Sequence, residues 1–132
     1  MVKAILAHLT GSECDDGVLT TAKRVGAPFG AHLECFHLRP NLAVLAAEAV
    51  RPEGDEDGLK ISNRFEILRK QVKESAHRAH MAFAAFCRRE NVPMAGAPPG
   101  PGGVTAAWLE KTAGDIEPLI SQARFNDLAV VA

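Results

Sequence analysis

The sequence predicts a single α/β domain built on a doubly wound parallel sheet, that is, a sheet covered by helices on both faces. Two observations support this prediction. Short apolar runs alternate with helical segments along all 132 residues, and the final run, "DLAVVA" (127–132), lacks the polar alternation of a half-exposed strand. Short connections join strands and helices, as in right-handed strand–helix–strand units. We see no internal repeat and no second domain, so one core is expected.

Four strands are expected, at residues 3–9, 31–38, 104–110 and 127–132. Arg39 and Pro40 would close the second strand, and Gly114 marks the break after the third. Because the last run is apolar throughout, we expect both faces of the fourth strand to be covered.

Three helices are expected, from Ser12 to before Gly30, over residues 59–91 and over residues 115–125. The middle helix carries one apolar stripe with three- and four-residue steps, formed by Ile61, Phe65, Leu68, Val72, Ala76, Ala79, Phe83 and Phe86. Residues 41–58 are ambiguous and fit a short helix capped by Asn41, followed by a mobile acidic loop. The run "PPGPGG" (98–103) cannot continue a helix and predicts a loop.

The first helix has a recognisable start signal. Ser12 is the expected N-cap, and Asp15, three residues later, completes an S-x-x-D capping pattern. Glu13 and Asp16 place further negative charge in the same first turn, where the helix dipole favours it.

The bulk composition excludes several classes of function. A net charge of -1 does not indicate the basic surface that proteins use to bind nucleic acid or an anionic membrane. No apolar stretch approaches the roughly 20 residues needed to span a bilayer. Three cysteines fall in three different predicted elements, with neither a metal spacing nor a disulfide framework, so we expect a reducing cytoplasm.

The candidate site follows from the predicted topology. Open α/β sheets bind ligands beyond the carboxyl ends of the strands, where strand order reverses, and here the first and fourth strands flank that point. The expected site residues are Thr10, Gly11 and Ser12 after the first strand, His37 and Leu38 at the end of the second, and Val131 at the end of the fourth.

Other polar clusters offer no catalytic or metal chemistry. His77 and His80 lie three residues apart on the long helix, but no third metal ligand is apparent. Ser12 near His8 lacks the G-x-S-x-G context of a nucleophile. His8 and His37 end neighbouring strands, where they are either ligand contacts or rim histidines. We therefore expect no metal, no catalytic residue and no enzyme activity.

The order and spacing of several motifs resemble the universal stress protein family. They are the opening "VKAILAHLTGSECDDGVLTTAKRVGAPFGAHLECFHLRP", the long helix, the stretch at 104–114 and the close "ARFNDLAVV". The resemblance covers nearly the whole chain. It implies a Rossmann-like parallel sheet of order 3-2-1-4, the family's fifth strand being absent, so that residues 1–132 form a domain truncated after its fourth strand.

The resemblance also implies a possible ATP site. Many members bind ATP through a glycine-rich segment directly after the fourth strand, a segment that would begin just past Ala132. The family usually has Asp where this chain has Thr10, whereas Gly11 and Ser12 match, and Leu38 matches a position that can contact adenine through its backbone.

Two hypotheses about function follow. The first is a stress-response module that binds an adenine nucleotide. The second is an interaction module that binds no nucleotide, as in members that lack the glycine segment. An open edge on the fourth strand invites pairing, so a homodimer or a tandem domain is expected. We expect an ATP affinity no tighter than about millimolar, because backbone donors for the phosphates are missing.

Overall fold

The computed structural model describes residues 1–49, 58–95 and 103–132. Its elements in chain order are β1 (Ala4–His8), α1 (Asp15–Gly26), a 3₁₀ turn (Ala27–Phe29), β2 (His32–Pro40), α2 (Leu42–Ala49), α3 (Gly58–Arg89), β3 (Thr105–Ala113), α4 (Glu117–Ala123) and β4 (Leu128–Val130). Residues 51–57 of the predicted acidic loop and most of the predicted Pro/Gly loop lie outside the described residues.

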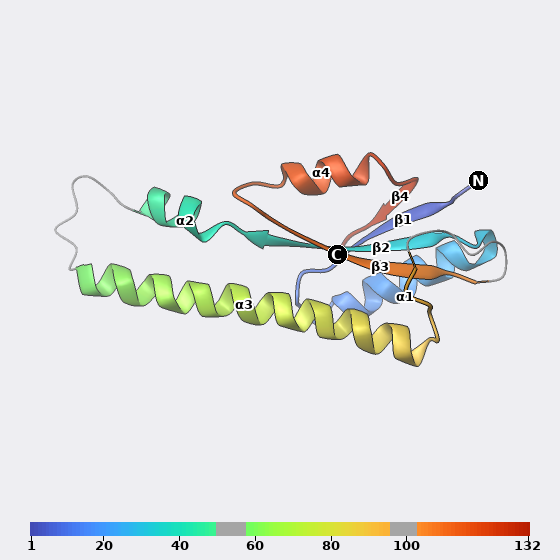
Figure 1. The fold of residues 1–132 in the computed structure, drawn as a ribbon, viewed down its shortest axis with the longest axis horizontal. Helices are drawn as coiled ribbons and strands as arrows, with labels where there is room; N and C mark the ends of the chain where they lie inside the picture. Colours follow the sequence, from blue (N-terminus) through green and yellow to red (C-terminus); the bar gives the residue numbers. More distant parts are fainter. Residues whose placement is uncertain (50–57, 96–102) are drawn as a thin grey trace.

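The strands form one parallel sheet in the order β3-β2-β1-β4, as predicted. Figure 1 shows α1 and α3 on one face of this sheet and α4 on the other. The first strand is therefore central, and its three middle residues, Ile5, Leu6 and Ala7, are buried. This arrangement is the doubly wound α/β architecture that the alternation of strands and helices predicts.

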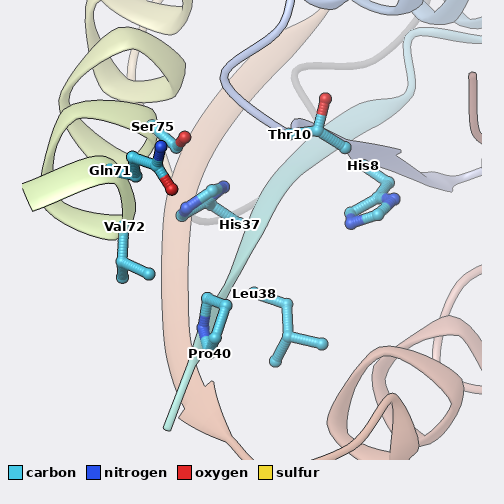
Figure 2. Close-up of a pocket in the computed structure, with 8 residues that line it drawn as sticks. All are labelled: His8, Thr10, His37, Leu38, Pro40, Gln71, Val72 and Ser75. Atoms are coloured by element: carbon cyan, nitrogen blue, oxygen red, sulfur yellow. The ribbon is translucent and has the colours of Figure 1, made fainter. Parts of the chain in front are cut away.

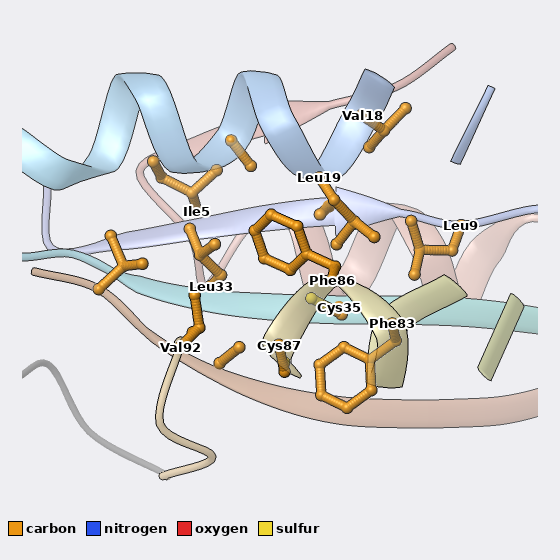
Figure 3. Close-up of a cluster of buried hydrophobic side chains, with 14 of the residues drawn as sticks. Ile5, Leu9, Val18, Leu19, Leu33, Cys35, Phe83, Phe86, Cys87 and Val92 are labelled. Atoms are coloured by element: carbon orange, nitrogen blue, oxygen red, sulfur yellow. The ribbon is translucent and has the colours of Figure 1, made fainter. Parts of the chain in front are cut away.

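The main core lies between the sheet and the helices α1 and α3 (Figure 3). Leu19 of α1, Leu33 of β2 and Phe86 of α3 are completely buried there. The predicted stripe on α3 is buried from Val72 to Phe86, whereas Phe65 and Leu68 are half-buried. The reason is visible in Figure 1, where the first turns of α3 extend past the end of the sheet. The side chain of Ile61 is outside the described part.

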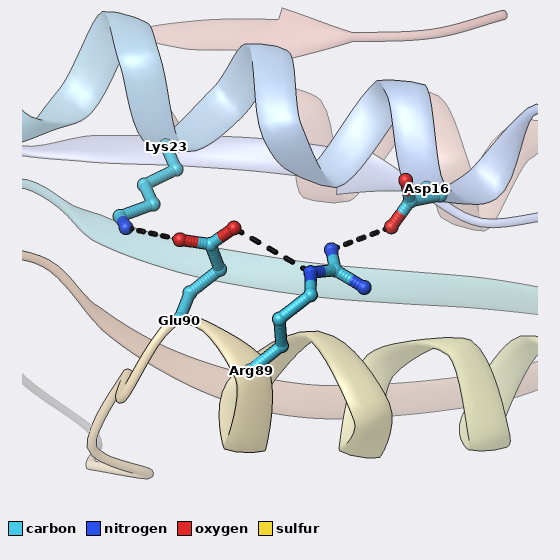
Figure 4. A network of polar contacts seen from close by, with 4 residues as sticks. All are labelled: Asp16, Lys23, Arg89 and Glu90. Carbon is cyan, nitrogen blue, oxygen red and sulfur yellow. Dashed lines mark hydrogen bonds and ion pairs between the residues drawn. The ribbon is translucent and has the colours of Figure 1, made fainter.

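Salt bridges fasten the end of α3 to α1 (Figure 4). Lys23 of α1 pairs with Glu90 at 2.7 Å, and Arg89 pairs with Asp16 of α1 at 2.7 Å. Arg89 also contacts its neighbour Glu90 at 3.5 Å. The hydrogen bond and charge of Lys23 lower the pKa of the Glu90 carboxyl. These groups are at the surface, so each pair contributes little to stability.

Three details differ from the prediction. Strands β2 and β3 are longer than expected, because they pair continuously as far as Pro40 and Ala113. Strand β4 has only three residues, and Leu128 is 43% exposed, so its expected burial on both faces is wrong. The Asp127 carboxylate instead fixes the start of this strand by accepting hydrogen bonds from the Lys3 and Ala4 amides at 2.7 and 3.0 Å.

The cap predicted for α1 is absent from the structure, whereas the cap predicted for α2 is present. Helix α1 begins at Asp15 after Cys14, and the Asp15 amide donates to the carbonyl oxygen of Ser12 at 3.3 Å. The Ser12 hydroxyl accepts instead from the Cys14 N–H at 3.3 Å, so it does not cap the helix. The predicted N-cap role of Ser12 is therefore wrong. The short helix expected in the first part of residues 41–58 is confirmed as α2, and Asn41 Oδ1 accepts from the Ala43 amide at 3.0 Å.

Candidate functional site: a pocket at the carboxyl ends of β1 and β2

A cavity of about 340 Å³ lies where β1 and β2 end beside α3 (Figure 2). Its lining combines polar groups with a few apolar side chains: His8, Thr10, His37, Leu38, Pro40, Gln71, Val72 and Ser75. The volume is in the range of pockets that hold small organic ligands. Two strand ends and one helix face thus build the site.

His37 is the most unusual group in the pocket. Its side chain is only 3% exposed, and its Nδ1 lies 2.7 Å from the carbonyl oxygen of Leu9. Its Nε2 is buried and has no hydrogen-bond partner among the described residues. Figure 2 shows the ring turned toward Gln71 and Ser75 on α3. Buried polar atoms normally have a partner, so this nitrogen is a candidate contact for a ligand in the pocket.

Trp108 of β3 stacks against the His37 ring. The two rings are stacked with centroids 6.2 Å apart. His80 of α3 meets the same tryptophan edge-on at 5.0 Å. His80 is thus a packing residue against Trp108 and is not among the residues that line the pocket. Among the residues in the described ranges, no three His, Cys, Asp or Glu side chains converge on one point.

The loop after β1 is held by an internal carboxylate. Asp15 is 2% exposed, and its two oxygens accept hydrogen bonds from the backbone amides of Thr10 and Gly11, each at 2.8 Å. The sequence predicts Asp15 in the first turn of the helix, where it completes an S-x-x-D capping pattern. In the structure Gly11 has φ +81°, and the loop doubles back so that its amides meet the carboxylate.

The same loop is docked onto α3. The Arg78 Nε donates to the carbonyl oxygen of Gly11 at 2.8 Å, and the Arg78 Nη2 lies 3.2 Å from the Ser75 hydroxyl. Gly11 sits directly against the backbone of the helix at Ser75. Its role in the structure is therefore close packing of the loop on the helix.

His8 lies at the rim of the pocket on the last residue of β1. Burial lowers the pKa of its imidazole, the nearby His37 lowers it further, and the charge of Asp15 acts in the opposite direction. The ring also lies 6.5 Å from that of Phe36. A half-buried neutral imidazole is therefore the resting state of His8 near neutral pH.

The structure brings three of the six predicted site residues into the pocket: Thr10, His37 and Leu38. Gly11 and Ser12 belong to the adjoining loop but do not line the pocket. Val131 follows β4 and is 61% exposed. The pocket thus lies on the β2 side of β1, whereas the predicted point of strand reversal lies on the β4 side.

The helical half of the lining was missed by sequence reasoning. Gln71 and Ser75 are four residues apart on α3 and flank Val72 of the apolar stripe. This spacing identifies one helix face. Which turn of the 32-residue helix meets the strand ends depends on tertiary packing, so the sequence contained no signal that singles out these two residues.

Comparison with known proteins bears on the fold. No protein-family model and no curated protein matches the chain. Its structure is similar to the crystal structure of a protein from the universal stress protein family of Burkholderia pseudomallei, with a TM-score of 0.54, at 20% identity, over 97% of this chain and 79% of the other. The chain has a universal-stress-protein-like fold.

A further solved structure, protein Rv1636 from Mycobacterium tuberculosis H37Rv, aligns with a TM-score of 0.45 at 16% identity over 99% of this chain and 71% of the other. In the chain described here, the four strands follow the order that the sequence resemblance implies. The pocket then lies at the carboxyl ends of its strands, the edge at which parallel α/β sheets bind ligands.

Proposed function

We propose that this chain is a stress-response module of the universal stress protein type that binds an adenine nucleotide weakly in the pocket beside His37. The observation that carries the proposal is the position of the cavity, at the carboxyl ends of the two strands β1 and β2, in a fold of this type. Leu38, whose counterpart in the family can contact adenine through its backbone, lies in the lining.

The expected affinity is low. Phosphate sites need free backbone amides or cationic side chains. The loop amides of Thr10 and Gly11 already bind Asp15. We therefore expect a dissociation constant for ATP of about 1 mM, equivalent to roughly 4 kcal/mol.

A titration of the ¹⁵N-labelled protein with ATP, followed by two-dimensional NMR, tests this proposal. Amide resonances at the ends of β1 and β2 and at Ser75 should shift together and saturate at millimolar concentrations. The variant Q71W would place an indole in the pocket and should abolish these shifts. The control is K70W, which changes the neighbouring exposed residue of α3 outside the lining. Equal shifts in both variants would contradict binding in this pocket.

A second candidate function is an interaction module that forms a homodimer. Within the described sheet β4 pairs only with β1, so its outer edge carries unpaired backbone groups. Exposed large apolar side chains also gather in the segment around this strand, namely Ile116, Ile120, Phe125, Leu128 and Val131. Covering them with a second copy would remove apolar surface from water.

We propose a binding protein without enzyme activity. Its three cysteines are free thiols, which suits a reducing cytoplasm. None of the helices in the described ranges is both long and apolar enough to cross a bilayer.

A further inference from the structure

We infer that the pocket recognises the uncharged nucleoside part of its ligand, that His37 Nε2 accepts a hydrogen bond from an N–H or O–H group of that nucleoside, and that the pocket holds no phosphate. This inference rests on the proposed function and narrows it. The number of phosphates on the ligand should then have little influence on affinity.

The hydrogen bond of His37 to the main chain fixes which ring nitrogen carries the proton. Its Nδ1 lies 2.7 Å from the Leu9 carbonyl oxygen, which can only accept a hydrogen bond. Nδ1 therefore carries the proton, and in the neutral ring Nε2 offers a lone pair. Since this buried nitrogen has no partner in the described structure, it selects a ligand atom that donates. A phosphate oxygen, which is an acceptor, would be repelled there.

The loop after β1, which could otherwise bind an anion, already holds a carboxylate. The Thr10 and Gly11 amides point at Asp15, whose carboxylate occupies the position of an external anion at 2.8 Å from each nitrogen. The carboxylate is buried, so its charge is poorly screened. A phosphate at this loop would compete for amides already in use and would meet a negative charge.

The described lining of the pocket offers a phosphate no cationic side chain of the Lys or Arg type. Arg78 approaches from α3, but its Nε and Nη2 are engaged by the Gly11 carbonyl oxygen and the Ser75 hydroxyl. The described lining therefore combines a fixed acceptor, hydroxyl and amide groups, and the apolar surface of Leu38, Pro40 and Val72. This combination fits a base and a ribose.

The experiment compares adenosine, AMP and ATP as ligands of the full chain. Each is titrated against the ¹⁵N-labelled protein, and the ring nitrogens of His37 are followed in a two-bond ¹H–¹⁵N spectrum. We expect dissociation constants within about threefold of one another, which corresponds to less than one tenfold step of 1.4 kcal/mol. We also expect His37 to be protonated on Nδ1 before ligand is added and the Nε2 resonance to move as ligand binds.

Two variants test the role of His37. In His37→Asn, the side-chain amide can still donate to the Leu9 carbonyl oxygen, but the Nε2 acceptor is gone. We expect adenosine binding to weaken at least about 5-fold, the lower end of what an unsatisfied buried donor costs. The control His80→Asn changes the other histidine that contacts Trp108, outside the pocket, and should bind adenosine as the unmodified chain does.

The outcomes separate this inference from the proposed function. If ATP bound ten or more times more tightly than adenosine, phosphate recognition would be real, and the inference would be wrong while the proposed function stood. Equal binding by H37N and the unmodified chain would overturn the role of Nε2 alone. If no ligand shifted any resonance at several millimolar, the proposed function itself would fail, and this inference with it.

Discussion

A Cβ atom added to Gly11 would lie 2.2 Å from the carbonyl oxygen of Ser75. The loop after β1 therefore touches the backbone of α3 at a point where no side chain fits. Gly11 also has φ +81°, a conformation that glycine adopts without strain. This contact sets the distance between the strand ends and the helix, and hence the width of the pocket between them.

Replacing Gly11 by alanine should destabilise the protein by at least about 2 kcal/mol, because the left-handed backbone alone costs about 1–2 kcal/mol and the clash with the α3 backbone adds to it. Urea denaturation measures the change. Gly17→Ala is the matched control, since a Cβ on Gly17 meets nothing within 4 Å. That variant should be more stable by up to about 1 kcal/mol. Equal effects at both positions would show that Gly11 does not pack as described.

Asp15→Asn should lower the free energy of unfolding by about 1–3 kcal/mol, because the new amide nitrogen cannot accept a hydrogen bond from the loop amide that faces it. Asp16→Asn provides the control at the next residue, where the carboxylate forms only an exposed ion pair with Arg89. That change should cost less than about 1 kcal/mol. If D16N lowered the free energy of unfolding more than D15N, Asp15 would not be the group that holds the loop.

Asp15→Asn should also change ligand preference. The substitution removes a negative charge beside the pocket, so ATP should gain affinity relative to adenosine while adenosine binding stays the same. We expect the ratio of the two dissociation constants to shift toward ATP by about threefold or more, consistent with loss of a partly screened charge. An unchanged ratio in a folded D15N variant would show that the charge of Asp15 does not weaken the binding of ATP.

The stability of the protein should fall as the pH is lowered from about 7.5 to 5.5. Burial lowers the pKa of both His8 and His32 from the value of 6.5, with Asp15 and Glu34 respectively opposing the shift. The unfolded chain therefore takes up protons that the folded chain resists, so unfolding becomes more favourable below pH 6.5. Urea midpoints across this range test it.

The double variant with His8→Asn and His32→Asn should show a flatter dependence of stability on pH over the same range. Carboxyl groups with lowered pKa values, such as Glu90 and Asp127, contribute only at lower pH, because their ordinary values are 4.5 and 3.8. A double variant with the slope of the unmodified protein would assign the effect to other groups.

If the β4 side forms a homodimer, Phe125→Ser should weaken it. Phe125 is 80% exposed in the single chain, and loss of a central aromatic contact commonly costs 2 kcal/mol or more, or about 30-fold in affinity. Sedimentation equilibrium of the unmodified chain and the variant measures this. Met81→Ser, an exposed apolar residue on α3, is the control. A chain that stays monomeric at high concentration would eliminate the interaction-module candidate.

The sequence by itself determined the kind and order of the elements. Strand and helix periodicities are local properties, so the alternation of apolar runs, the stripe from Val72 to Phe86 and the Asn41 cap could be recognised without coordinates. Strand order came from a resemblance over the chain, and the sheet confirms it.

Only the tertiary structure decided what the site is made of. Ser75 lies against Gly11, although the two residues are 64 positions apart in the sequence. The Leu9 carbonyl oxygen holds the His37 ring through a hydrogen bond between residues 28 positions apart. Asp15 likewise became a buried partner of the loop amides because Gly11 turns the chain back, which a capping pattern does not reveal. Such contacts depend on how distant segments pack, and local periodicity carries no information about that packing.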